Sequence, residues 1–373
     1  APPLPGRPPI PSTHPPSCGG EACAMERPAG ALERPLLSKL RPRPAAASPL
    51  VLLCLVAYLG SGISQPLAMS AVRLAGLGDT TCQLYMLPYY LGQAATGLLA
   101  VCEPSPRRRW SSFPLHRCAA IALVSAVAQN MNYAGNMLAG SAIFAVVYSS
   151  VTVWCALLSR LLLQRVLNPA QWAAVLLVFF GLALAGLGAR SDGSQVLVGA
   201  GMVVVGSFLH AFTHVVSELV SVRGGKVPPQ INCCVQGLTA CLVVGAWECV
   251  YTLPHLDKVL EPAQTAGTSL QTAVLLLGSL AVGNFVHAAS FFYLLARIGA
   301  VSAGVAKALQ AVAVFLLSHV LYCEQDASQC LTPAKTTSLV VVVSGALAYA
   351  LATAAAATTA AKAAPADKGA KGP

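Results

Sequence analysis

The chain has 373 residues, of which 56% are hydrophobic and only 10% are charged, and its mean hydropathy is +0.67. A soluble protein of this composition would have too little polar surface to cover itself, which excludes an ordinary soluble enzyme. The net charge of +10 requires no nucleic-acid partner, because basic tails and loops account for it. We therefore predict an all-α, polytopic membrane protein that contacts membrane lipid and no nucleic acid.

Ten apolar blocks follow one another between short polar breaks. Each is about 20 residues long, the length with which a helix crosses the ~30 Å hydrocarbon core of a bilayer. No segment outside these blocks is long enough to hold a soluble catalytic domain. The expected membrane spans are residues 49–71, 82–102, 117–136, 140–163, 169–188, 196–220, 229–251, 271–296, 299–321 and 335–354.

The basic residues of the loops and tails indicate how the helices are oriented. With the N-terminus in the cytosol, nine Lys and Arg residues fall in cytosolic loops and four in the opposite loops, as the positive-inside rule requires. We predict that residues 1–48 form a disordered, basic cytosolic tail. Residues 355–373 are expected to form a disordered C-terminal tail, also in the cytosol.

Thirteen cysteines are scattered along the chain, mostly one at a time within expected helices. No CxxC pair indicates zinc binding or redox chemistry, so we expect no metal and no cofactor. Cys323 and Cys330 are different, because they share a short loop on the non-cytosolic side, where oxidation is allowed. These two cysteines are candidates for a disulfide.

The two halves of the chain resemble each other. The segment "GSAIFAVVYSSVTVWCALLSR" from Gly140 aligns with "GAVSAGVAKALQAVAVFLLSH" from Gly299, and farther on Gly181 aligns with Gly345. Each half holds five expected spans, an odd number, so the second half must be inverted relative to the first. Inverted repeats with a substrate site near the midplane are typical of alternating-access transporters. We predict two five-helix repeats, residues 49–190 and 196–354.

The order of the ten spans resembles that of the drug/metabolite transporter superfamily, on its nucleotide-sugar-transporter and EamA-like side. The blocks "SRLLLQRVLNPAQWAAVLLVFFGLALAGLG" and "GAVSAGVAKALQAVAVFLLS" carry the resemblance. It implies a ten-helix carrier, commonly an endomembrane antiporter that exchanges a nucleotide sugar for a nucleoside monophosphate. The "GVAK" ending at Lys307 is similar to the "GALNK" segment of mannose-nucleotide carriers, but Ala306 stands in place of the asparagine.

Lys307 stands about eight residues inside an expected span, roughly 12 Å deep at 1.5 Å per residue. A charge at that depth costs at least ~2.5 kcal/mol, so it normally faces a wet cavity or a partner. We expect its ammonium to neutralise a phosphate or carboxylate of the substrate, with Gln310 on the same helix face. The alternative is a structural, ion-paired lysine.

In the sixth span, His210, His214 and Glu218 recur every four residues on one helix face. This pattern fits cavity lining or proton coupling, since histidine titrates near neutral pH. It also fits a structural row. Two histidines at this spacing can chelate a metal, but the rest of a ligand set is missing from the sequence pattern.

Amide, phenol and imidazole groups also interrupt the third, fourth and eighth spans. Such groups can orient a polar solute, or they can join helices by hydrogen bonds. The candidates for substrate binding are Asn132, Tyr133, Asn136, Tyr148, Asn284 and His287.

These observations predict a secondary active transporter of a small-molecule anion, in the first place a nucleotide-sugar antiporter of the Golgi or another endomembrane. One alternative is a proton-coupled carrier or exporter of amino acids, peptides or drug-like solutes in a vacuolar or plasma membrane. Another is a membrane scaffold without transport activity. No nucleophile elbow, Walker loop or HExxH motif indicates an enzyme. The sequence is compatible with a homodimer.

Overall fold

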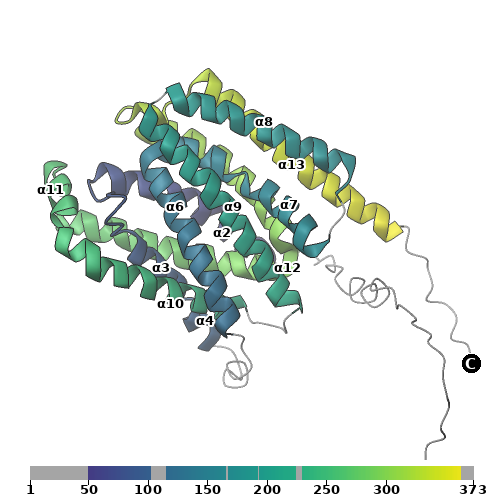
Figure 1. Ribbon diagram of the computed structural model, residues 1–373, viewed down its shortest axis with the longest axis horizontal. Helices are drawn as coiled ribbons and strands as arrows, with labels where there is room; N and C mark the ends of the chain where they lie inside the picture. Colours follow the sequence, from purple (N-terminus) through teal and green to yellow (C-terminus); the bar gives the residue numbers. More distant parts are fainter. Residues whose placement is uncertain (1–48, 102–114, 165–166, 192, 224–228, 363–373) are drawn as a thin grey trace, which may run out of the picture. The chain divides into compact units, whose positions relative to one another are not determined.

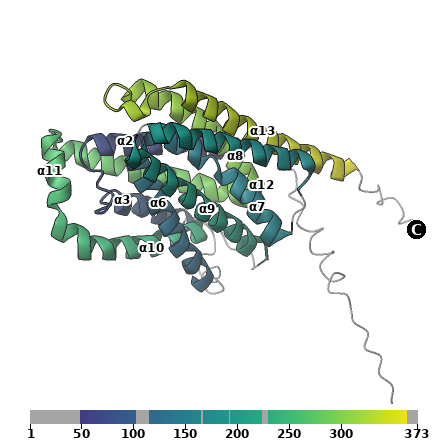
Figure 2. The same ribbon diagram turned by 45° about the horizontal axis from the view of Figure 1, so that its top comes forward.

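The computed structural model describes residues 49–101, 115–164, 167–191, 193–223 and 229–362, which form helices joined by short connections (Figure 1, Figure 2). These residues contain no β-strand, so the all-α prediction is confirmed for them. The N-terminal tail predicted over residues 1–48 and the last part of the C-terminal tail, residues 363–373, lie outside the described residues.

The helices follow the chain in a simple order, with one π-helix (η1) and two 3-10 turns (η2, η3) among them. Their bounds are α2 (Pro49–Leu74), α3 (Met86–Ala94), α4 (Gly97–Val101), α6 (Leu115–Tyr148), α7 (Val151–Leu163), α8 (Pro169–Ser191), α9 (Ser194–Arg223), α10 (Pro229–Trp247), η1 (Glu248–Thr252), η2 (Leu253–His255), α11 (Asp257–Thr265), α12 (Leu270–Tyr322), η3 (Ala327–Gln329) and α13 (Pro333–Lys362).

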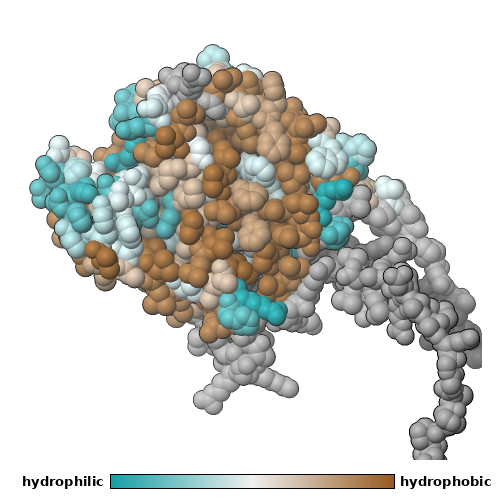
Figure 3. Space-filling model, in the orientation of Figure 1, coloured by the Kyte–Doolittle hydropathy of each residue, from teal (hydrophilic) through white to brown (hydrophobic). Residues whose placement is uncertain are grey.

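Five of these helices are long and apolar enough to cross a membrane, or six if the bent pair α6 and α7 counts as one span. Apolar side chains cover much of the outside, for example Leu242 at 76% exposure and Leu270 at 80%. Figure 3 shows this as a broad hydrophobic surface with hydrophilic patches near its edges. An apolar exterior of this size is stable only against lipid, so the described helices belong to a multi-pass membrane protein.

The second expected span, residues 82–102, is not one continuous helix. It contains α3 and α4, which are separated at Ala95 and Thr96. The Thr96 hydroxyl donates to the Gln93 carbonyl at 2.7 Å, a local bond that competes with the regular helical ladder. The apolar composition of this block predicted one membrane span and did not show the break.

Helix α6 is interrupted at Gly140, whose φ of 77° and ψ of 160° are not helical. The third and fourth expected spans meet at this residue. Only glycine adopts such angles without strain, because any other side chain would clash with its own backbone. The break frees backbone N–H groups at the start of the second segment, and these groups need new partners.

Helix α12 combines the eighth and ninth expected spans. Its residues 287 and 310 both contact Tyr58: the ring centroids of His287 and Tyr58 lie 4.7 Å apart, and the Gln310 amide donates to the Tyr58 carbonyl at 2.7 Å. In a straight helix, 23 residues would separate them by about 34 Å. The chain of α12 therefore turns back on itself between these two contacts.

The C-terminal boundary differs from the prediction of a disordered tail that begins at residue 355. Helix α13 continues to Lys362, because the segment "AAAATTAAK" is rich in alanine, the residue with the highest helix propensity.

Helices α8 and α13 pack closely through a pair of glycines. A methyl group added at Gly181 would lie 2.9 Å from the backbone nitrogen of Val342, and one added at Gly345 would lie 3.0 Å from that of Val178. Small residues allow helix backbones to approach in this way, which favours packing where no hydrophobic effect drives association.

Candidate functional site

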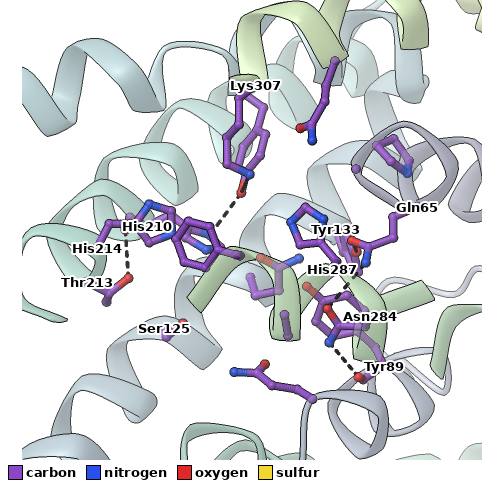
Figure 4. Close-up of a pocket in the computed structure, with 18 of the residues that line it drawn as sticks. Gln65, Tyr89, Ser125, Tyr133, His210, Thr213, His214, Asn284, His287 and Lys307 are labelled. Atoms are coloured by element: carbon purple, nitrogen blue, oxygen red, sulfur yellow. Dashed lines mark hydrogen bonds between the residues drawn. The ribbon is translucent and has the colours of Figure 1, made fainter. Parts of the chain in front are cut away.

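A cavity of about 90 Å³ lies among α2, α3, α6, α9, α10 and α12 (Figure 4). Aromatic rings form much of its wall, and five glutamines from five different helices contribute amide groups. None of the described lining residues is an aspartate, a glutamate or an arginine. A polar cavity inside an apolar exterior is the arrangement expected of a protein that binds polar ligands within a membrane.

Lys307 projects into this cavity from α12 and is only 6% exposed. Its Nζ lies 3.4 Å from the Tyr148 hydroxyl, and 4.6 Å and 5.6 Å from the ring centroids of Tyr148 and Tyr58. The aromatic faces stabilise the ammonium partly, by cation–π attraction. Within the described part of the chain no carboxylate pairs with Nζ. The ammonium thus has aromatic and hydroxyl neighbours but no ionic partner among the described residues.

His210 and His214 project from α9 into the same cavity. Their ring centroids are 4.6 Å apart, and His214 also packs against the Phe291 ring at 4.7 Å. The Asn132 side-chain nitrogen lies 3.4 Å from His210 Nδ1. The contact joins α6 to α9 beside the cavity, and the tautomer of His210 decides which of the two groups donates.

His287, from α12, completes the group of imidazoles. Its Nδ1 lies 3.1 Å from the Ser61 hydroxyl, and its ring contacts Tyr58. Figure 4 shows Lys307 at the top of the cavity, His210 and His214 on the left, and His287 on the right. One ammonium and three imidazoles thus face one space.

A hydrogen-bond network joins α2, α3, α6 and α12 in the wall of the cavity. The Tyr133 hydroxyl donates to Gln65 Oε1 at 3.2 Å, and Gln65 Nε2 donates to Asn284 Oδ1 at 3.5 Å. Asn284 in turn donates to the Tyr89 carbonyl at 2.8 Å. Nearby, Gln129 Oε1 is buried and has no hydrogen-bond partner among the described residues. A buried acceptor without a donor is unfavourable, and a donor that reached it would remove this cost.

Most of the predicted site residues come together at the cavity. Those that line it are Lys307, Gln310, Tyr133, Tyr148, Asn284, His287, His210 and His214.

Three predicted residues do not line the cavity. Asn132 contacts His210 from the side, and Asn136 donates to the Pro66 carbonyl at 3.5 Å. Both asparagines join helices. Glu218 lies one turn beyond His214 on α9 and is likewise not a lining residue.

Other lining residues were not predicted as site residues, notably Gln65, Gln93 and Gln236. Gln65 precedes a proline in an otherwise apolar span, and this isolated amide was the signal that could have identified it. Gln93 and Gln236 likewise lie inside the second and seventh expected spans, so the same signal was present for them.

A second polar cluster lies at the break in α6. We call it the Gln329 cluster, defined as Ser70, Ser141, Ala142, Ser318 and Gln329. Gln329 Oε1 accepts from the Ser141 hydroxyl at 3.1 Å, the Ala142 N–H at 3.2 Å and the Ser318 hydroxyl at 2.6 Å. Its Nε2 lies 3.5 Å from the Ser70 hydroxyl. Gln329 thus satisfies a backbone donor that the break at Gly140 exposes.

The Gln329 cluster lies one helical turn from the cavity on three elements. Ser70 follows the lining residue Pro66 on α2, and Ser318 follows Val314 on α12, each by four residues; on α6, Ser141 comes just before Phe144 and Ala145. The cluster therefore joins α2, α6 and α12 on one side of the cavity.

Cys323 and Cys330 form a disulfide that closes the loop carrying Gln329. The His319 ring lies beside it, and its nitrogen and the two sulfurs are all within 4.8 Å of one another. Because the sulfurs are bonded to each other, they are not free to act as thiolate ligands to a metal.

The same loop holds Asp326, which pairs with Arg73 of α2 at 2.8 Å. Burial acts to raise the pKa of Asp326. Hydrogen bonds from Ser328 and the charge of Arg73 outweigh burial, so the pKa of Asp326 lies below its ordinary value. The carboxylate therefore stabilises the contact between α2 and the disulfide-closed loop.

We expect Asp326→Asn to lower the free energy of unfolding of the detergent-purified protein by roughly 1 kcal/mol, because Arg73 is partly exposed. A carboxylate with a depressed pKa stabilises the fold above its unfolded pKa of about 3.9 and loses that effect as the pH falls through the folded value. Thermal unfolding midpoints of wild type and variant should differ by a constant amount from about pH 8 to about pH 5 and converge below about pH 4. Convergence already near neutral pH would contradict the assignment to Asp326.

Neither protein-family models nor curated protein sequences match this chain. A solved structure described only as "Crystal structure of protein" superposes with a TM-score of 0.53 at 16% sequence identity, over 82% of this chain and 98% of that one. At this identity the likeness concerns the helical fold alone.

Proposed function

We propose that this protein is a secondary active transporter that carries a small-molecule anion across a membrane by alternating access. The observation that supports this most is the environment of Lys307. Its ammonium is buried in a polar cavity within lipid-facing helices, and no described lining residue is acidic. A buried charge without a counter-ion is unfavourable, so it is retained where an anionic ligand neutralises it.

We further propose that ten spans form two oppositely oriented repeats, residues 49–190 and 196–354, as in the drug/metabolite transporter superfamily. The packing of α8 against α13 supports this arrangement. Gly181 packs against Val342, and Gly345 packs against Val178. Gly345 lies 164 positions after Gly181, and Val342 lies 164 positions after Val178, so the two contacts are equivalent under the proposed repeat. Such reciprocal contacts are expected around a two-fold axis. A pseudo-two-fold axis in the membrane plane relates inverted repeats.

The Gln329 cluster is a suitable gate for alternating access. It connects α2 and α6, from the first proposed repeat, with the end of α12 and η3, from the second. The Arg73–Asp326 ion pair also joins the first proposed repeat to the second. In this proposal these contacts hold one side closed and separate when that side opens.

We propose a location in the Golgi or another endomembrane, with both termini in the cytosol. The excess of basic residues in the proposed cytosolic loops supports this orientation. The Cys323–Cys330 disulfide supports it as well, because a disulfide persists on the non-cytosolic side of the membrane. Protease protection of epitope tags at either end, in sealed vesicles, tests the orientation.

A second candidate function is a proton-coupled carrier of organic solutes. The three histidines beside Lys307 favour it, since imidazoles titrate near neutral pH and can carry the coupled proton. The two candidates differ in what drives uptake of the solute. The first candidate exchanges it for an anion on the other side of the membrane, and the second uses a proton gradient.

Transport by purified protein in sealed liposomes distinguishes these functions. The liposomes are loaded with an unlabelled anion, and uptake of the same labelled anion is measured with and without a pH gradient. The panel contains nucleotide sugars, nucleoside monophosphates, monocarboxylates and amino acids. Uptake that requires internal anion supports the exchanger, and uptake driven by the pH gradient alone supports the proton-coupled carrier. Failure of every solute in correctly inserted protein would favour the scaffold and contradict transport.

A further inference from the structure

The cavity contains one permanent cation among the described lining residues. Lys307 is that cation, and no arginine lines the space. The other basic groups on the wall are the imidazoles of His210, His214 and His287, which carry no permanent charge. Proteins usually hold diphosphates with several cations, above all with bidentate arginine, because such groups bring about two negative charges. The permanent positive charge of the wall therefore matches a single negative charge on the ligand.

The size of the cavity also favours a small ligand. Its volume is about 90 Å³, whereas pockets for drug-sized ligands enclose about 300 to 1,000 Å³. A nucleoside diphosphate sugar is as large as many drugs and would require a much wider space. A small organic acid is much closer to the size of this space.

The walls beside Lys307 favour a flat ligand. Phe144, Tyr148 and Phe291 line the cavity. Tyr148 presents its ring face to the ammonium and stacks on Phe144 with centroids 5.0 Å apart. Aromatic rings in such positions stack favourably on another planar ring.

The side of the cavity away from Lys307 offers hydrogen-bonding groups. In Figure 4, Ser125, Asn284 and Tyr89 lie at the bottom, opposite Lys307 at the top. Gln129 follows Ser125 by one turn on α6, and its buried Oε1 has no partner among the described residues. An unsatisfied acceptor is best matched by a hydroxyl or N–H group on the ligand.

From these features we propose that the transported anion is a small planar monocarboxylate with a hydrogen-bond donor at the end opposite its carboxylate. The carboxylate pairs with Lys307, the ring lies between the aromatic side chains, and the donor bonds to Gln129 Oε1. The inference rests on the proposed transport function and replaces the nucleotide sugar as the favoured substrate class.

Equilibrium dialysis of the full-length protein in detergent tests this inference with four radiolabelled probes: benzoate, 4-hydroxybenzoate, cyclohexanecarboxylate and UDP-glucose. Benzoate and cyclohexanecarboxylate have the same charge and similar size, but only benzoate is planar. We expect benzoate to bind about tenfold more tightly than cyclohexanecarboxylate, and 4-hydroxybenzoate more tightly than benzoate. UDP-glucose should bind more weakly than either aromatic acid.

Two variants assign the contacts. Lys307→Met should remove binding of all three carboxylates, whereas Gln129→Leu should remove only the advantage of 4-hydroxybenzoate over benzoate. Equal binding of benzoate and cyclohexanecarboxylate would overturn the planar ligand. Tighter, Lys307-dependent binding of UDP-glucose would overturn the monocarboxylate class and leave anion transport standing. If no probe binds through Lys307 and the liposome panel also shows no transport, both proposals fail.

Discussion

Replacing Lys307 with methionine is expected to reduce anion transport by at least about 30-fold, while the protein remains inserted and folded. Removing one partner of a buried charge pair typically costs 2 kcal/mol or more, and about 1.4 kcal/mol corresponds to a factor of ten. Methionine keeps much of the length of the side chain, so the loss reports the missing charge and not a collapsed cavity. Initial rates of exchange in liposomes measure the effect.

The stability of the same variant separates a binding role from a structural one. Lys307 has no carboxylate partner among the described residues, and its ammonium is buried against tyrosine rings. Removing an uncompensated charge should therefore raise the thermal unfolding midpoint or leave it unchanged. A structural lysine would behave in the opposite way, with a lower midpoint.

The matched control is Lys258→Met. Lys258 lies on α11, outside the cavity, where its Nζ contacts the Tyr251 hydroxyl at 3.0 Å. This variant removes the same charge from the protein but should leave transport at the wild-type rate. Full transport by Lys307→Met, or equal loss in both variants, would contradict the role of Lys307 in binding.

Gly140→Ala is expected to be the most destabilising of the glycine substitutions considered. The φ of 77° and ψ of 160° at Gly140 belong to a region that is almost restricted to glycine. An added methyl group would also lie within 2.8 Å of Gln329 Cδ and 3.0 Å of the Ser328 hydroxyl. Strain and displacement of Gln329 together should cost about 3 kcal/mol, which lowers the unfolding midpoint by roughly 5–10 °C.

Gly201→Ala is the control, because this glycine lies within α9 and an added methyl group would meet nothing within 4 Å. Its unfolding midpoint should stay the same or rise slightly, since alanine favours a helix. The double variant Gly140→Ala/Gln329→Ala should be less destabilised than the sum of the single variants, because Gln329→Ala removes the clashing group. Strict additivity would show that Gln329 does not occupy the break in α6.

The amino-acid sequence by itself determined the class of this protein. Its apolar blocks fix an all-helical membrane protein, because each segment long enough to cross the bilayer must satisfy its own backbone hydrogen bonds. The cost of charge in hydrocarbon likewise identified Lys307, and the four-residue spacing identified His210 and His214 as one face of a helix. Both arguments depend on local sequence alone.

The tertiary structure decided which polar residues share a space. Asn132, Asn136 and Asn284 are all amides inside expected apolar spans. Asn284 lines the cavity, whereas Asn132 and Asn136 form contacts between helices beside it. Gln65 and Gln236 become wall residues only because α2 and α10 bring them together. A single sequence shows which residues share one face of a helix, but it does not show what that face contacts. The contacts depend on how each helix is rotated and paired, which packing between distant segments decides. For the same reason the sequence showed Gly140 as a boundary between two spans, while only the folded chain placed Gln329 in the break.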